Sequence, residues 1–152
     1  MADTDNAEPQ VKTAAQLRAE LLEAEIKKMD EEKAEREAAH KAHAAFAEKF
    51  LHEDVTEEER ALIRRLVQKA VQDGKFQTMI YSFPSTLCTD RGRAINNALP
   101  DWPETLQGKA KQVYQRFEEV ARPAGYKLTA TIINFPNDVP GDVGFFLSWS
   151  EF

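Results

Sequence analysis

The chain has 152 residues, of which 42% are hydrophobic and 30% charged, and its formal net charge is -6. This length suits one domain, or a smaller domain with an extension, and is too short for two full cores. The acidic balance disfavours nucleic acid and anionic membrane surfaces as partners, because both attract basic proteins. No apolar run approaches the about 20 residues of a transmembrane helix, and the acidic first residues are unlike a secretory signal.

Cys88 is the only cysteine, so no disulfide can form within the chain. A chain that folds without disulfides is suited to a reducing compartment. We therefore expect the protein in the cytoplasm.

Charge and aromatic residues divide the chain near residue 55. Residues 1–54 hold 8 Lys and Arg against 14 Asp and Glu, whereas residues 55–152 hold 12 of each. Both Trp, all three Tyr and seven of the nine Phe lie after residue 55. The pattern predicts a disordered N-terminus over 1–11, an acidic helical arm over 12–54 and a compact domain over 55–152.

The arm is built almost entirely from strong helix formers, and Thr13 with Gln16 forms a candidate capping box at its start. Its apolar residues follow the 4-3 spacing of a coiled-coil seam at Ala15, Ala19, Leu22, Ile26 and Met29. The same spacing then continues through Lys33, Arg36, His40 and His43. The seam is therefore broken, and the arm either pairs over its first half or is a solitary helix with ion pairs. The candidate partner-binding residues are Leu22, Ile26 and Met29.

The domain opens with a capping box from Thr56 to Glu59, and the helix that follows ends near Gly74. Strand-like patterns cover 76–83, 126–135 and 143–149, and the turn-rich segment 136–141 predicts an antiparallel hairpin between the last two. A short helix is expected over 93–99.

A further capping box, from Asp101 to Glu104, predicts the last helix, with Leu106, Ala110, Val113, Phe117 and Val120 on one face. The resulting order is α-β-α-α-β-β. We expect an α+β fold in which two or three helices pack on a small, largely antiparallel three-stranded sheet, preceded by a long charged N-terminal helix.

The segment 85–97 leaves a strand and enters a helix, a place where hydroxyls, arginines and backbone N–H groups can hold a phosphate or carboxylate. It matches neither the phosphate-loop nor the dinucleotide-binding pattern. In the alternative interpretation, Asp90 or Thr89 simply caps the helix. The candidate anion-binding residues are Ser85, Thr86, Thr89, Arg91, Gly92, Arg93, Asn96 and Asn97.

Cys88 lies in the same segment, where a helix start and arginines would lower a thiol pKa. All three histidines lie in the arm, so the usual base is missing and a buried structural thiol is the competing interpretation. His40 and His43 share one helical side with Glu37, but further metal ligands are missing. The sequence indicates neither a metal nor a cofactor.

Three functions follow from these patterns. The leading hypothesis is a non-catalytic interaction or oligomerisation protein, in which the arm reaches or pairs with a protein partner or a second copy. The alternative is a regulatory domain that binds an anionic small molecule or nucleotide at 85–97. A weaker alternative is a small enzyme that uses Cys88.

Overall fold

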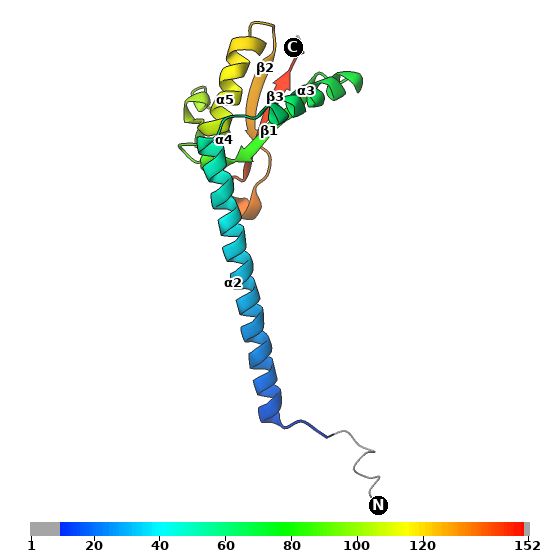
Figure 1. The fold of residues 1–152 in the computed structure, drawn as a ribbon, viewed down its shortest axis with the longest axis vertical. Coiled ribbons are helices and arrows are strands. Elements are labelled where there is room, and N and C mark those ends of the chain that lie inside the picture. The colour runs from blue at the N-terminus through cyan, green and yellow to red at the C-terminus, as the bar shows by residue number, and fades with distance from the viewer. Residues whose placement is uncertain (1–9, 151–152) are drawn as a thin grey trace, which may run out of the picture. The chain divides into compact units, whose positions relative to one another are not determined.

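A 39-residue helix, α2 (Ala14–His52), begins close to the start of the described residues, 10–150, in this computed structural model (Figure 1). The chain divides into two units, Met1–Ala44 and Ala45–Phe152, and α2 belongs to both. The disorder predicted for 1–11 falls outside the described residues except at positions 10 and 11, which are exposed and non-helical.

The predicted capping box starts α2. The backbone N–H of Thr13 donates to Oε1 of Gln16 at 2.8 Å, and the N–H of Gln16 donates to Oγ1 of Thr13 at 3.1 Å. All side chains of residues 10–46 are exposed. Helix formation over 14–44 therefore relies on backbone propensity rather than on burial.

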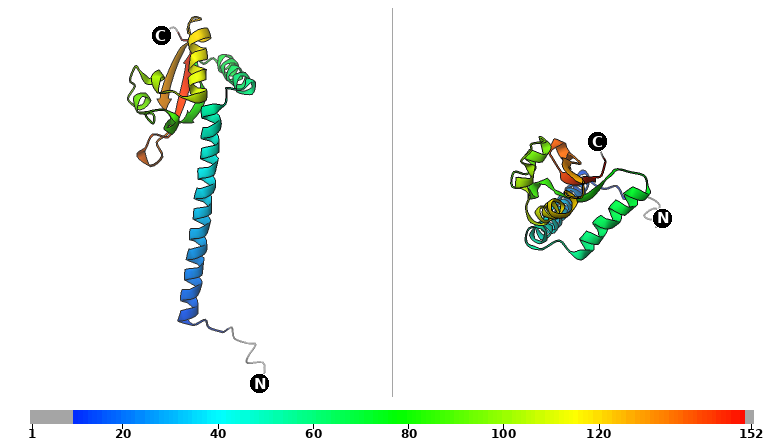
Figure 2. Two further views of the ribbon diagram at one scale, coloured as in Figure 1. Left: turned by 60° about the vertical axis from the view of Figure 1, so that its left-hand side comes forward. Right: turned by 90° about the horizontal axis from the view of Figure 1, so that it is seen from above.

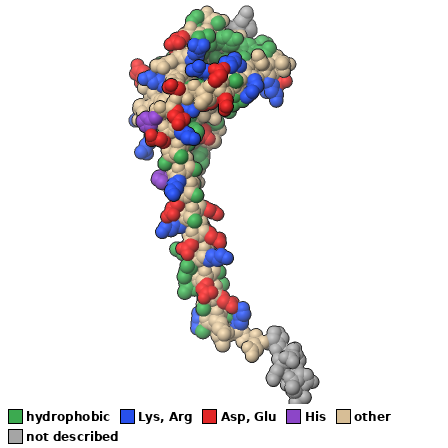
Figure 3. Space-filling view, viewed as in Figure 1, with side chains coloured by type: hydrophobic (Ala, Val, Ile, Leu, Met, Phe, Trp, Pro, Cys, Tyr) green, Lys and Arg blue, Asp and Glu red, His purple; other side chains and the backbone are tan. Residues whose placement is uncertain are grey.

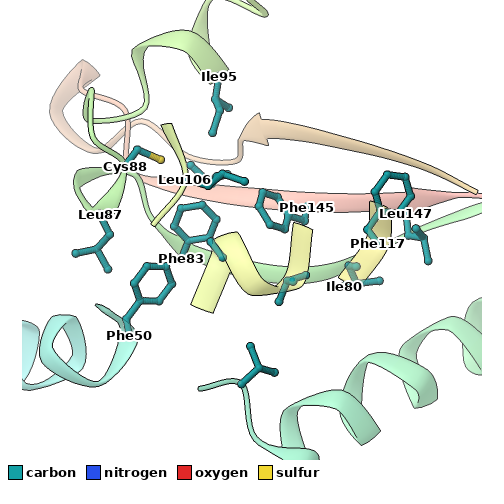
Figure 4. Packing of buried hydrophobic residues seen from close by; sticks show 14 of the residues in the cluster. Phe50, Ile80, Phe83, Leu87, Cys88, Ile95, Leu106, Phe117, Phe145 and Leu147 are labelled. Carbon is teal, nitrogen blue, oxygen red and sulfur yellow. The ribbon is translucent and has the colours of Figure 1, made fainter. Parts of the chain in front are cut away.

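The packed unit starts ten residues earlier than the sequence suggested, because the last turns of α2 belong to it. Phe50 is only 1% exposed, and its ring stacks on Phe83 with the centroids 5.4 Å apart. Figure 4 shows Phe50 pointing from the end of α2 toward Phe83 and Leu87. Composition alone placed Phe50 in the arm.

Three strands form one antiparallel sheet in the order β1 (Gln77–Pro84), β3 (Asp142–Ser148), β2 (Lys127–Ile132). The α+β class and the hairpin pairing of β2 with β3 are confirmed. A bulge between Met79 and Tyr81 inserts Ile80 into β1. One face of the sheet carries the core residues Phe83, Ile132, Val143, Phe145 and Leu147.

The helices of the packed unit cover this face and one edge of the sheet (Figure 2). Residues of α4 (Arg93–Asn96), of α5 (Gly108–Arg116) and of the π turn that extends α5 (Phe117–Ala121) contribute Ile95, Ala110, Val113 and Phe117 to the core. The helix α3 (Glu57–Gln72) contacts β1 and buries Ala70, while its Leu62 and Val71 remain exposed. The contact with the sheet thus leaves part of the apolar surface of α3 uncovered.

The capping box predicted from Asp101 to Glu104 is wrong. The segment Trp102–Thr105 is a short 3-10 turn, Asp101 makes no capping hydrogen bond with its side chain, and α5 begins only at Gly108. Core packing explains the difference, since Trp102 contacts the rings of Tyr114 and Phe145. That packing fixes the turn and separates it from α5.

Two further helix predictions change at their ends. The helix expected over 93–99 stops at Asn96, and Ala98 adopts a positive φ of 52°. Val120 is exposed, while Ala121 packs against the core, because the widened π turn shifts the face that points inward.

The opposite face of the sheet carries Met79, Ser82, Thr129 and Thr131, all exposed, together with the half-buried Phe146. The connection from β2 to β3 is closed by Asn134, which accepts from the N–H of Asp142 at 2.7 Å and donates Nδ2 to its carboxylate at 3.1 Å.

Within residues 10–150, no helix is long and apolar enough to cross a bilayer.

Candidate functional site

Ser85, the first candidate anion ligand, is part of the packing. Its side chain is 1% exposed, its Oγ donates to the carbonyl oxygen of Pro140 at 3.1 Å, and its N–H donates to that of Gly141 at 2.9 Å. These bonds tie the end of β1 to the β2–β3 connection. The neighbouring Thr86 is exposed.

The start of α4 is occupied by a carboxylate of the chain itself. Oδ1 of Asp90 accepts from the N–H of Gly92 at 3.0 Å, and Oδ2 accepts from the N–H of Ala94 at 2.8 Å. These are the donors that a bound phosphate or carboxylate would use. An incoming anion would therefore meet a negative charge. The N-cap position itself is Gly92, so neither Asp90 nor Thr89 is the N-cap, although Asp90 binds two N–H groups at this helix start.

The other candidate residues do not converge on a common point. Gly92 is buried with a φ of 83°, and a Cβ there would lie 2.8 Å from the Cβ of Ser85, so these two residues meet through close packing. The N–H of Thr89 donates to the carbonyl oxygen of Thr105 at 2.9 Å. The remaining candidates have exposed side chains: Thr86, Thr89, Arg91, Arg93, Asn96 and Asn97.

Cys88 is a buried thiol, with 3% of its surface exposed. Burial raises its pKa to about 11, against an ordinary value of 9.0, and the lowering effect of a hydrogen bond with Thr105 does not offset this. The nearby Asp90 carboxylate also opposes ionisation of the thiol. Since the thiolate is the nucleophile, the setting suits a packing residue better than a reactive one.

One charged cluster was not predicted. Nζ of Lys109 on α5 lies 2.6 Å from Oε1 of Glu59 on α3, and their side chains are 13% and 28% exposed. Burial opposes ionisation of Glu59, but hydrogen bonds from Lys109 and from the N–H of Thr56 outweigh it and lower its pKa. Burial and the Glu59 charge together raise the pKa of Tyr81. Fifty residues separate Glu59 from Lys109, so no local pattern signals the pair.

The helix over 14–44 displays the predicted partner-binding residues. Leu22 is 61% exposed, Ile26 49% and Met29 60%. Since they are spaced by four and three residues, they share one face with Ala15 and Ala19. We call this face the seam, defined as Ala15, Ala19, Leu22, Ile26 and Met29. Figure 3 shows hydrophobic patches between acidic and basic side chains along this helix.

Acidic residues line both sides of the seam. In a heptad, the positions next to the seam face the flanks of a partner helix. On one side these positions are Gln16, Glu23 and Asp30, and on the other side they are Arg18, Glu25 and Glu32. The sequence contains this signal, but the spacing of apolar residues indicates only the seam itself. Leu17 and Leu21, also exposed, lie on the other side of the helix.

Metal ligands are dispersed. Within the described range 10–150, no three His, Cys, Asp or Glu side chains gather closely enough to hold a metal ion. His40 and His43 are exposed on α2.

The chain matches no protein-family model, and comparisons with curated proteins and with solved structures found no similar protein.

Proposed function

We propose that this is a non-catalytic interaction protein of the cytoplasm, whose seam on residues 15–29 docks against a helix of another protein molecule. The observation that carries the proposal is the exposure of Leu22, Ile26 and Met29, each about half exposed or more on one helical face. In this proposal the packed unit 45–152 is the folded body that holds the last turns of α2.

The energetics support a real but modest docking surface. Burying a whole Leu, Ile or Met side chain contributes about 1.5–3 kcal/mol, so covering the remaining surface of three half-exposed residues contributes about 3–5 kcal/mol. A micromolar complex needs about 8 kcal/mol. Contacts beyond these three side chains are therefore required, and the flanking positions of the helix are the nearest source.

The geometry of 85–97 gives less support to the alternatives. Asp90 satisfies the backbone donors that an anion would use, and the Cys88 thiol is buried with a raised pKa. We therefore advance neither an anion-binding nor a thiol-based function.

The proposal is tested with the full chain and two matched double variants. Leu22→Gln with Ile26→Gln removes apolar surface from the seam, whereas Leu17→Gln with Leu21→Gln removes it from the other side of the same helix. Gln keeps high helix propensity, so helicity is retained in both. Sedimentation velocity measures self-association, and cross-linking in extracts of the native host, read by mass spectrometry, maps partner contacts on residues 15–29.

We expect association, with itself or with another protein, that is lost in the seam variant and kept in the control variant. Equal association of native chain and seam variant would contradict the proposal.

A further inference from the structure

We propose that the partner of the seam is a basic amphipathic helix of a different protein, rather than a second copy of this chain. The inference rests on the proposed function, since it specifies the partner of the same seam. It is drawn from the charges that flank the seam and from the residues that continue it.

Self-pairing in parallel would bring acidic residues together. In a parallel pair, a flanking residue on one helix faces the opposite flank of its partner five residues further along. Arg18 would then face Glu23, which is favourable. Glu25 would face Asp30 and Glu32 would face Glu37, and both contacts are repulsive.

Self-pairing in the antiparallel sense has the same difficulty. Each flank then faces the same flank of the second copy. One flank offers Glu23 and Asp30, which are both acidic, and the other offers Glu25 and Glu32 against a single basic residue, Arg18. Acidic contacts therefore outnumber favourable ones in the parallel pair. In the antiparallel pair centred on Leu22 and Ile26, the contacts of Glu23 with Glu23 and of Glu25 with Glu25 offset those of Arg18 with Glu32, so charge gives no net attraction.

The residues that continue the seam also disfavour a second copy. After Met29 the seam positions are taken by Lys33 and Arg36, both exposed on α2. In a parallel self-paired helix these cations would face the same cations at the apolar contact, and in the antiparallel pair centred on Leu22 and Ile26, Lys33 would face Ala15. Charge at such a contact is costly unless it is paired with the opposite sign.

These features together describe the partner. It is a helix of about two to three heptads with apolar residues at the seam positions and Lys or Arg at both flanks, and its apolar stripe ends opposite Met29. Its cations would meet Glu23, Glu25, Asp30 and Glu32. These four acidic flanking residues lie on the same helical face as the exposed apolar seam, so one basic helix can contact both.

The test uses two synthetic helical peptides and the full-length chain. Both peptides have Ile and Leu at the seam positions; one has Lys at every flanking position and the other has Glu. Fluorescence anisotropy of the labelled peptides measures binding at low and at high salt. We expect the Lys peptide to bind at least about tenfold more tightly than the Glu peptide, and its affinity to fall as salt screens the charges.

A charge-matched pair of chain variants locates the effect. Glu25→Lys with Asp30→Lys reverses two flanking charges, while Glu31→Lys with Glu35→Lys makes the same change in net charge away from the seam. We expect the first variant to lose its preference for the Lys peptide and the second to keep it. A loss of equal size in both would show attraction by net charge alone and overturn the inference.

The outcomes separate this inference from the function on which it rests. Equal binding of both peptides, abolished by Leu22→Gln with Ile26→Gln, would leave helix pairing in place and overturn the basic partner. Self-association of the native chain through the same two residues would do likewise. If neither peptide binds and the chain does not associate through the seam, both the inference and the proposed function fail.

Discussion

At the scale of single residues, Asp90 shows how a short polar side chain can occupy a helix start. Its two carboxylate oxygens accept from the N–H of Gly92, the N-cap of the four-residue helix α4, and from the N–H of Ala94 within that helix. Helix starts leave N–H groups without backbone partners, and a side-chain oxygen that binds them stabilises the fold. The same property that makes the segment 85–97 resemble an anion site is thus used within the chain.

Replacing Asp90→Ala is expected to lower the free energy of unfolding by about 1–2 kcal/mol, because two hydrogen bonds to a charged group are lost. Urea unfolding followed by circular dichroism measures the change. Asp101→Ala is the matched control, since the Asp101 side chain caps nothing, and should be nearly neutral. An Asp90→Ala chain as stable as the control would mean that the carboxylate contributes nothing.

Cys88 offers a second residue-scale prediction. A pKa near 11 in place of 9.0 leaves about a hundredfold less thiolate at about pH 8. Burial restricts access of reagents as well. Iodoacetamide should therefore label Cys88 at least about a hundredfold more slowly in the folded chain than in urea, as measured by mass spectrometry. Labelling at similar rates in both states would restore Cys88 as a candidate nucleophile.

At the scale of elements, a single glycine at the start of α5 allows that helix to pack closely against the end of α2. Gly108 has a φ of 56°, and a Cβ built there would lie 2.1 Å from the carbonyl oxygen of Phe50. The close approach lets Phe50 reach Phe83 in the core. Both a left-handed backbone and the absence of a side chain are needed at this position.

Gly108→Ala should cost about 3 kcal/mol, from backbone strain plus a steric clash. Gly74→Ala supplies the comparison, because Gly74 also has a positive φ of 74° but has nothing within 4 Å of its would-be Cβ. It should cost only about 1 kcal/mol. The difference between the two variants, measured by thermal or urea unfolding, isolates the contact with α2. Equal losses of unfolding free energy in the two variants would mean that the close contact of Gly108 with α2 does not contribute.

Local sequence patterns predicted some elements correctly and others wrongly, and each outcome has a physical cause. Thr56 and Glu59 form the predicted capping box because its partners lie three residues apart and need no tertiary support. The same pattern at Asp101 failed because Trp102 packs into the core and fixes a 3-10 turn. The bulge at Ile80 and the contact of Gly108 with Phe50 depend on residues distant in sequence.

The candidate site divides in the same way. The seam has a local spacing, so the sequence alone places Leu22, Ile26 and Met29 on one helical face, and all three are exposed. That they bind a partner stays a prediction. The anion-binding candidates were chosen by residue type along 85–97, but the fold uses Ser85 and Asp90 for internal hydrogen bonds. Residue type cannot show whether a donor or acceptor is already satisfied.

At the scale of the packed unit, acid should weaken the ion pair of Glu59 with Lys109, which joins α3 to α5. The pKa of Glu59 is lowered in the folded chain, so its ionised form contributes stability above its unfolded pKa, near 4.5. That contribution disappears as pH falls below about 4.5 and through the folded pKa. It is restored on return to neutral pH.

Urea midpoints between about pH 6 and pH 3 test this expectation. Glu59→Gln keeps the capping geometry but removes the charge, so its midpoint should fall less steeply with acid than that of the native chain. Glu58→Gln, which removes an exposed carboxylate from the same turn, should follow the native curve. If Glu59→Gln instead follows the native curve, the pair with Lys109 does not contribute to acid sensitivity.

The continuity of α2 has a further consequence for how the helix forms. Starting a helix is unfavourable by a factor of about 10⁻³, whereas each added residue is close to neutral. The buried turn at Phe50 supplies that nucleus, so residues 14–44 need only propagate from it. A proline at Ala38 would separate residues 14–37 from this nucleus. Circular dichroism should then show that the helicity of residues 14–37 is lost. Proline at Ala14, the first helical position, should lose almost none, because the first turn tolerates it. Helicity at the proposed binding residue Leu22 would then depend on a nucleus that lies 28 residues further along the sequence, outside the seam.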